Sequence, residues 1–237
     1  MRYYLFCLFL SLFIFSCDNS TKIKLTKLEG SPAYENAKIE IDTIAIEEQE
    51  YSFKFNVIDY NLGEQTENEF SFDMANSEKG QHIHFIVNNG PYSAYYSSEF
   101  KKKLEGENNI ILAFLSRSYH ESVKNPNAFF ITQIGDGVKI DLSNEFLFYS
   151  RPKGIYSGID TEKLLLDFYL VNTNISPDGN KVRATIQDTE FIIEEWAPYY
   201  IEGLKKGEIN IKLELINNKG DLIQTSFNPS VRKVILE

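Results

Sequence analysis

The chain has 237 residues, with 24 Lys and Arg against 34 Asp and Glu, and a formal net charge of −10 at pH 7. This acidic balance argues against nucleic acid as a partner, because proteins bind phosphate backbones by neutralising them with Lys and Arg. It also disfavours electrostatic docking onto anionic lipid. With 43% hydrophobic and 14% aromatic residues, the chain has enough apolar side chains to build two cores of ordinary domain size.

The first residues have the features of an export signal. Arg2 gives a positive start, and residues 3–15 are almost entirely apolar. That stretch is shorter than the roughly 20 residues of a membrane-spanning helix. The segment Ile14-Phe15-Ser16-Cys17 is similar to a lipobox, where a peptidase cuts before an acylated cysteine. We therefore expect residues 1–16 to be a lipoprotein signal peptide and Cys17 to be lipidated. The alternative is an ordinary secretory signal with a chance cysteine.

The segment after Cys17 is polar, and residues 17–33 are expected to form a flexible tether. Because Cys7 lies in the removed segment, Cys17 is the only cysteine of the mature chain and no internal disulfide is possible. Cleavage also removes Arg2 and no acidic residue, so the net charge becomes −11. We expect a body anchored by lipid to the outer or inner membrane, facing the periplasm or the cell surface.

From residue 36 onward, short alternating apolar runs indicate β-strands. Turn signals such as Asn89-Gly90 and Asp136-Gly137 lie between the runs. The expected strands span residues 37–46, 51–58, 82–87, 109–115, 128–134, 138–142, 145–150, 163–171, 181–186, 208–216 and 231–236. No long helix is predicted, although residues 95–104 and 193–204 are each compatible with a helical turn.

An internal repeat organises these strands. Residues 82–121 line up with residues 181–221, and residues 53–61 line up with residues 166–174. Two copies of about 100 residues match the size of an immunoglobulin-like sandwich. The predicted fold is therefore all-β, with two tandem immunoglobulin-like β-sandwich domains at residues 34–142 and 143–237.

The two copies differ in the faces of their strands. In the second copy the apolar residues Val182, Ala184 and Ile186 alternate with polar ones, as expected for a sheet with one wet face. In the first copy Ile83, Phe85 and Val87 are expected in the core, which leaves His82, His84 and Ile86 on the outer face. On the later strand we expect Ile110, Leu112 and Phe114 to point inward and Ile111, Ala113 and Leu115 outward.

An outer face built from histidine and apolar residues needs cover. The other domain, the connection at residues 125–150 or a partner protein can supply it. Cover from within the chain is the preferred interpretation.

The three histidines of the chain are the candidate metal ligands. His82 and His84 are two residues apart on a strand and project from the same face, and His120 follows the neighbouring strand. Neutral imidazole is a common ligand of zinc and copper, and three histidines make an open site. Glu121 is a candidate further ligand or hydrogen-bond partner of a ligand. The alternative is that the histidines only pack and hydrogen-bond.

A second candidate site is cationic. Ser-Arg pairs at residues 116–117 and 150–151 lie near strand ends, and Arg117, Arg151 and Lys153 are candidates to bind a phosphate or carboxylate group. The alternative is that both arginines pair with carboxylates of the acidic chain.

No catalytic motif is present: the chain lacks G-x-S-x-G, H-E-x-x-H and a Walker loop, and it has no candidate cysteine nucleophile. We therefore expect a protein that is not an enzyme, and a metal-assisted hydrolase is the remote alternative.

The segments at residues 80–96, 113–122, 146–158, 164–172 and 196–215 resemble a flavobacterial-type family of Bacteroidota lipoproteins, whose members carry the name phosphopeptide-binding protein. The resemblance covers nearly the whole mature chain. It implies an outer-membrane or periplasmic lipoprotein and assigns no activity. The leading interpretation is a membrane-anchored, non-enzymatic binding protein for a protein, a peptide or a small anionic ligand. The alternative is a zinc- or copper-binding protein that uses the histidines.

Overall fold

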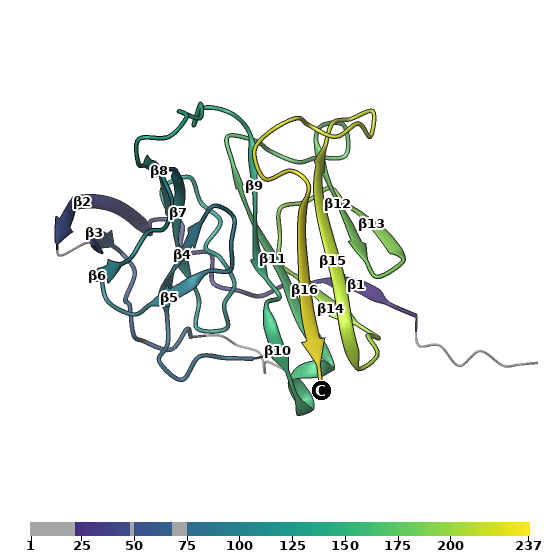
Figure 1. Ribbon diagram of the computed structural model, residues 1–237. Helices are drawn as coiled ribbons and strands as arrows, with labels where there is room; N and C mark the ends of the chain where they lie inside the picture. The colour runs from purple at the N-terminus through teal and green to yellow at the C-terminus, as the bar shows by residue number, and fades with distance from the viewer. Residues whose placement is uncertain (1–21, 48–49, 68–74) are drawn as a thin grey trace, which may run out of the picture.

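The computed structural model describes residues 22–47, 50–67 and 75–237, so the expected signal peptide and Cys17 lie outside the described residues. Within these ranges the chain forms strands and one short 3-10 helix, η1 (Gly158–Thr161) (Figure 1). Among the described residues, no helix has the length and apolar character needed to cross a membrane.

The strands follow one another along the whole described chain. They are β1 (Lys24–Lys27), β2 (Lys38–Glu47), β3 (Glu50–Ile58), β4 (His82–Val87), β5 (Ser93–Tyr95), β6 (Glu99–Lys102), β7 (Asn109–Ser116), β8 (Phe129–Ile134), β9 (Phe146–Arg151), β10 (Gly154–Tyr156), β11 (Lys163–Val171), β12 (Lys181–Ile186), β13 (Thr189–Ile193), β14 (Tyr199–Glu202), β15 (Gly207–Ile216) and β16 (Ser230–Leu236).

These strands form four sheets in two sandwiches. The first sandwich pairs the sheet β2-β3-β6 with the sheet β5-β4-β7-β8. The second pairs the sheet β9-β11-β14-β1 with the sheet β13-β12-β15-β16-β10. Apart from β1 and β10, each strand of one sandwich has a counterpart at the same place in the other. The internal repeat and the all-β, immunoglobulin-like fold class are therefore confirmed.

Several local expectations were wrong. The expected tether is not free along its length, because β1 pairs antiparallel with β14 at the edge of the second sandwich. The two expected helical turns contain β6 and β14 instead. Phe100 of β6 packs against the first core and Tyr199 of β14 against the second, and β14 is paired on both sides, with β11 and with β1. Residues 138–142 are not a strand: Ile140 and Leu142 anchor the connection by packing, without ladder pairing.

The strand faces of β4 and of the second copy are as expected. Ile83 and Phe85 are buried in the first core, and Val182, Ala184 and Ile186 are buried in the second. The expectation for β7 was wrong. The residues that face the first core are Ile111, Ala113 and Leu115, and those that face away from it are Ile110, Leu112 and Phe114.

The register explains the reversal on β7. Ile83 lies opposite Leu115, and Phe85 lies opposite Ala113. Residues directly opposite one another in an antiparallel pair project from the same face of the sheet. The β7 sequence is apolar on both faces, so it carries no alternation from which its orientation can be read.

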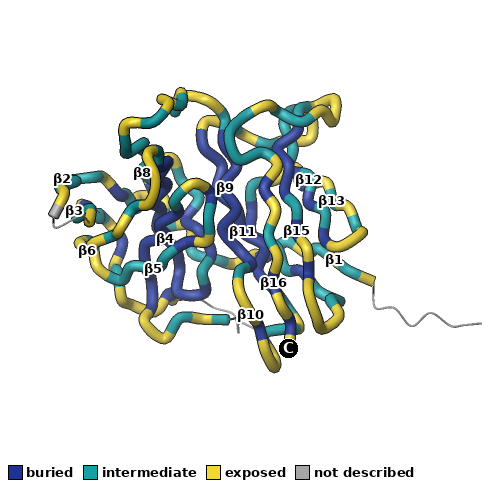
Figure 2. The backbone as a smooth tube through the Cα atoms, in the orientation of Figure 1, coloured by how far each residue is buried: buried dark blue, intermediate teal, exposed yellow. Residues whose placement is uncertain are grey.

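The outer face of β4 and β7 packs against β9 and β11 of the second domain. We call this contact the domain junction, and its buried apolar members are Ile86, Tyr92, Ile110, Leu112, Phe114, Phe146, Phe148, Tyr169 and Val171. Buried backbone therefore runs through the middle of the molecule, along β4, β9 and β11 (Figure 2). The expectation that this face is covered from within the chain is confirmed.

Polar contacts fix the two domains at the junction. Asp167 on β11 is fully buried, accepts a hydrogen bond from Ser122 Oγ at 2.9 Å and pairs with Lys124 Nζ at 2.5 Å. Asn89, in the turn after β4, donates to Ser230 Oγ at 2.9 Å and accepts from the backbone N–H of Tyr149 at 2.8 Å. These polar contacts fix how the two domains are aligned with each other across the apolar junction.

The Phe148→Ala substitution tests the energetic weight of the junction. Because the ring is fully buried between the domains, its loss should lower the free energy of unfolding by about 3–5 kcal/mol, as for other buried phenylalanines. Urea denaturation measures the change. The matched control is Val138→Ala, where the side chain is 83% exposed and the expected change is within about 0.5 kcal/mol. Equal stabilities of the two variants would contradict the prediction.

Candidate metal centre

The three histidines meet at the edge of the domain junction. The Nε2 atoms of His82 and His84 are 2.9 Å apart, and His120 Nδ1 lies 3.1 Å from His82 Nε2. One nitrogen from each ring lies within 4.8 Å of the other two. His82 and His84 are fully buried, whereas His120 is partly exposed. The convergence expected from the sequence is present, although the second domain now closes one side of the cluster.

A tight turn after β7 returns His120 to the strand that carries the other two histidines. The backbone N–H of His120 donates to the Arg117 carbonyl at 2.8 Å, and the N–H of Arg117 donates to the Glu121 carbonyl at 2.8 Å. His120 itself has a φ of 70°, in the left-handed region that side chains other than glycine rarely adopt.

The second copy has the same turn with a different residue at this point. There the N–H of Asn217 donates to the Asp221 carbonyl, and Gly220 takes the left-handed position with a φ of 87°. Glycine is the residue that this conformation favours, because it has no Cβ. A histidine in its place carries about 1 kcal/mol or more of backbone strain. Backbone strain that is kept in one copy and avoided in the other is typical of a functional site.

The hydrogen bonds of the ring nitrogens do not account for the cluster. His82 Nδ1 lies 2.8 Å from the Gly80 carbonyl, so this nitrogen carries the proton and His82 Nε2 presents its single lone pair to the cluster. That lone pair accepts one hydrogen bond, from either His84 or His120. The nitrogen of the other histidine also lies close, although His82 Nε2 has no second lone pair to offer it.

One contact from outside the cluster orients His84: its Nδ1 lies 3.3 Å from Ser150 Oγ on β9, which leaves its Nε2 facing the cluster. The Tyr92 hydroxyl lies 3.2 Å from His120 Nδ1, the same nitrogen that faces His82, so Tyr92 borders the cluster itself. Ser150 belongs to the second domain, so the geometry of His84 depends on the junction. The role of Tyr92 had no signal in the sequence.

The environment keeps the imidazoles neutral. Burial lowers the pKa of His82 to about 4. Burial, followed by the charge of Arg151, lowers the pKa of His120 well below its usual range, and burial also lowers the pKa of His84. Neutral imidazole is the form that binds a metal ion.

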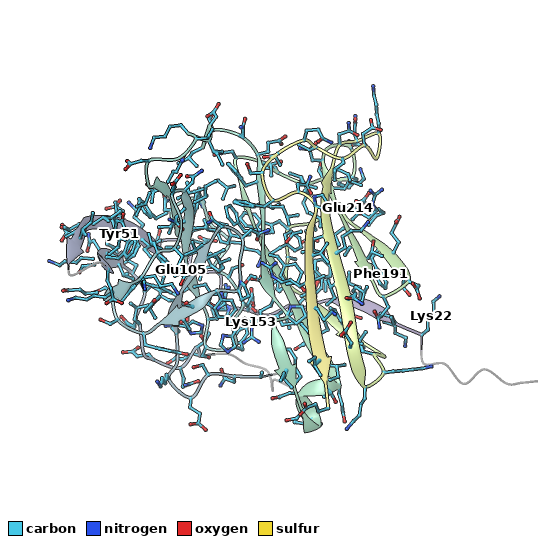
Figure 3. All side chains as sticks on the ribbon, viewed as in Figure 1. Lys22, Tyr51, Glu105, Lys153, Phe191 and Glu214 are labelled. Carbon is cyan, nitrogen blue, oxygen red and sulfur yellow. The ribbon has the colours of Figure 1, made fainter. Side chains whose placement is uncertain are left out.

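Two cationic side chains, Arg151 and Lys153, lie next to the Tyr92 ring. His84 stacks on the Tyr92 ring with centroids 3.5 Å apart, and Lys153 Nζ lies 3.7 Å from the same centroid, so the two groups occupy opposite faces. The Arg151 guanidinium lies 5.5 Å from this centroid and donates from Nη1 to the Tyr156 hydroxyl at 2.7 Å. Figure 3 labels Lys153 between the two sandwiches.

Two other predicted site residues lie elsewhere. Arg117 is not part of the cationic pair: it is paired with Glu121 at 3.0 Å and donates to the carbonyls of Pro32 and Ser122. Glu121 is likewise turned away from the histidines, toward Arg117 and Ser31. The expected roles of Arg117 in anion binding and of Glu121 at the metal site were therefore wrong. These residues instead hold residues 31–32 against the first domain.

No protein-family model and no curated protein matches the chain. Among solved structures, the fibronectin(III)-like modules of Clostridium thermocellum CbhA are 12% identical, with a TM-score of 0.31, over 84% of this chain and 94% of that chain. The FN1–FN3 domains of chicken CNTN1 are 11% identical, with a TM-score of 0.25, over 88% and 68%.

A Bacteroides ovatus mixed-linkage glucan utilization protein, SGBP-B, in complex with a mixed-linkage heptasaccharide, is 8% identical, with a TM-score of 0.18, over 66% of this chain and 61% of that chain. At these identities and TM-scores the likeness says nothing about what this chain binds. The immunoglobulin-like class of this chain follows from its own strand order and pairing.

The positive φ of His120 predicts that glycine is a more stable replacement than alanine at this position. His120→Gly should be more stable than His120→Ala by about 1 kcal/mol, because both lack the ring and only alanine keeps a Cβ in the left-handed region. Urea denaturation without added metal measures the difference. Gly220→Ala is the matched control: nothing lies within 4 Å of the added Cβ, so a loss of about 1 kcal/mol is expected from φ alone. A His120→Ala variant that is at least as stable as His120→Gly would contradict the prediction.

Proposed function

We propose that this chain is an extracytoplasmic binding protein that holds one zinc or copper ion with His82, His84 and His120. The observation that carries the proposal is the approach of three neutral imidazole nitrogens to one another, with one contact that hydrogen bonding leaves unexplained. A metal ion between the rings accepts all three lone pairs at once.

The ligand type supports zinc or copper among the divalent ions. Imidazole suits these metals, whereas calcium and magnesium prefer oxygen ligands. Three histidines leave a coordination position open for a further ligand. Among the described residues, no hydrogen bond or ion pair brings a carboxylate to the three ring nitrogens.

Metal titration of the purified full chain tests the proposal. One zinc or copper ion should bind per chain, and His84→Ala and His120→Gly should each weaken binding at least about 100-fold, because each removes a direct ligand. Glycine is chosen at position 120 because it favours the positive φ of this turn, so the variant should fold well. Competition against a chromophoric chelator gives the affinities.

The control for this titration is Arg183→Ala, since Arg183 occupies in the second copy the position that His84 has in the first. It should bind like the unaltered chain. Affinities that are unchanged in both histidine variants would refute the proposal.

The same titration at pH 7.5 and pH 6.0 examines the protonation state of the ligands. Three ordinary imidazoles with a pKa of 6.5 would lose about 50-fold in affinity over this interval through proton competition. Because burial lowers the pKa of all three histidines, the expected loss is less than about threefold.

We further propose that the chain is anchored by lipid on Cys17, on the strength of the apolar residues 3–15 and the Ser16-Cys17 pair that follows them. The chain labelled with radioactive palmitate in its host should lose the label in Cys17→Ser and should leave the detergent phase on phase separation. Label that persists in the serine variant would count against the anchor.

A further inference from the structure

Arg151 is a buried charge without an acidic partner. It is 8% exposed, its Nε has no hydrogen-bond partner, and no carboxylate in the described part of the chain lies within ion-pair distance of it. Buried charges are ordinarily paired, because removing an unpaired ion from water is costly. Arg117 illustrates the ordinary case, since it is buried to a similar degree and paired with Glu121.

Lys153 adds a second positive charge at the same place. Its Nζ donates to the Tyr92 carbonyl at 2.8 Å and has no carboxylate partner among the described residues. Burial, followed by the charge of Arg151, lowers the pKa of Lys153 to about 8. Two cations thus lie close enough to disfavour one another, in a chain that otherwise carries an excess of acidic residues.

Tyr92 connects these cations to the histidines. Its ring lies between His84 and Lys153, and its hydroxyl contacts His120 Nδ1 at 3.2 Å. Arg151 lies beside the same ring. The charge of Arg151 also contributes, after burial, to the lowered pKa of His120. The cationic pair and the histidine cluster therefore form one continuous site.

Charge balance at this site calls for an anion. A divalent ion on three neutral histidines, together with Arg151 and Lys153, gives a strongly positive, largely buried centre that no carboxylate in the described part of the chain pairs with. We propose that the three-histidine site takes a small carboxylate as its further ligand, held against Arg151, with the charge of Lys153 adding to the attraction from the other face of the Tyr92 ring. The inference deepens the proposed function, because it rests on the metal ion that the histidines bind.

The chemistry of the groups favours a carboxylate. The planar guanidinium of arginine matches the two oxygens of a carboxylate, and one of these oxygens is also a good ligand for zinc or copper. A single negative charge suits a site in which His82 and His84 are fully buried, because a phosphate dianion is costlier to bring out of water. Inorganic phosphate therefore serves as the comparison oxyanion.

The test uses the full chain loaded with Co²⁺, whose visible absorption bands respond to a change of ligand. The loaded protein is titrated with sodium acetate at constant ionic strength set by perchlorate. Acetate should shift the bands saturably, and Arg151→Met should weaken acetate binding at least tenfold. Lys153→Met should weaken it by a smaller factor, since Lys153 is only half-buried. Arg183→Met and Lys212→Met, on the second domain, are the matched controls and should bind acetate normally.

A second readout separates a binding role of Arg151 from a merely structural one. In acetate-free buffer, Arg151→Met should bind Co²⁺ as tightly as the unaltered chain or a few-fold more tightly, because a cation next to the metal ion has been removed. A variant that had lost its structure would bind both Co²⁺ and acetate poorly. Weaker acetate binding together with retained Co²⁺ binding supports the proposal.

The outcomes distinguish the two claims. Bands that do not respond to acetate or phosphate, or an acetate affinity within twofold of normal in Arg151→Met, overturn the anion site while the metal site stands. Tighter binding of phosphate than of acetate, with the same dependence on Arg151, supports an oxyanion site and overturns the choice of a carboxylate. Failure of Co²⁺, Zn²⁺ and Cu²⁺ alike to bind in acetate-free buffer overturns the proposed function and the metal-held anion together. Calorimetry of the metal-free chain with acetate then shows whether Arg151 binds an anion by itself.

Discussion

The contact between the two domains is the interaction on which the rest of the structure depends. The face of β4 and β7 is apolar, and it is hidden from water only because β9 and β11 cover it. Burial of a sheet face of this kind is the main favourable term in such an association. The buried pair of Asp167 and Lys124 then allows one alignment of the two domains. The chain is best understood as one stacked body of four sheets.

The histidine cluster is a product of that contact. His82 and His84 project from the strand face that the second domain covers, and Ser150 of that domain meets His84 directly. Burial at the junction also keeps the imidazoles neutral. In the second copy the equivalent strand face is partly exposed and carries Lys181 and Arg183 in the places of the histidines. The same sandwich thus has a charged, partly exposed face in one copy and a buried, histidine-bearing face in the other.

Much of this arrangement could be predicted from the sequence, because it follows from local pattern. Alternation along residues 181–186 and the repeat itself define the longer strands, and the spacing of His82 and His84 places them on one face. The orientation of β7 could not be predicted, since both of its faces are apolar. Nor could the partners of Arg117 and Arg151, which are set by contacts between residues far apart in the chain. Short strands such as β6 and β14 carry too few residues for a pattern to show.

The pairing of β1 with β14 has a consequence for how the molecule stands on a surface. In the lipid-anchored form that we propose, Lys24 would lie seven positions along the chain from the anchor, a span of at most about 25 Å when fully extended. The chain would then enter its folded body at the second sandwich, the one encoded last, and reach the histidine-bearing sandwich only afterwards.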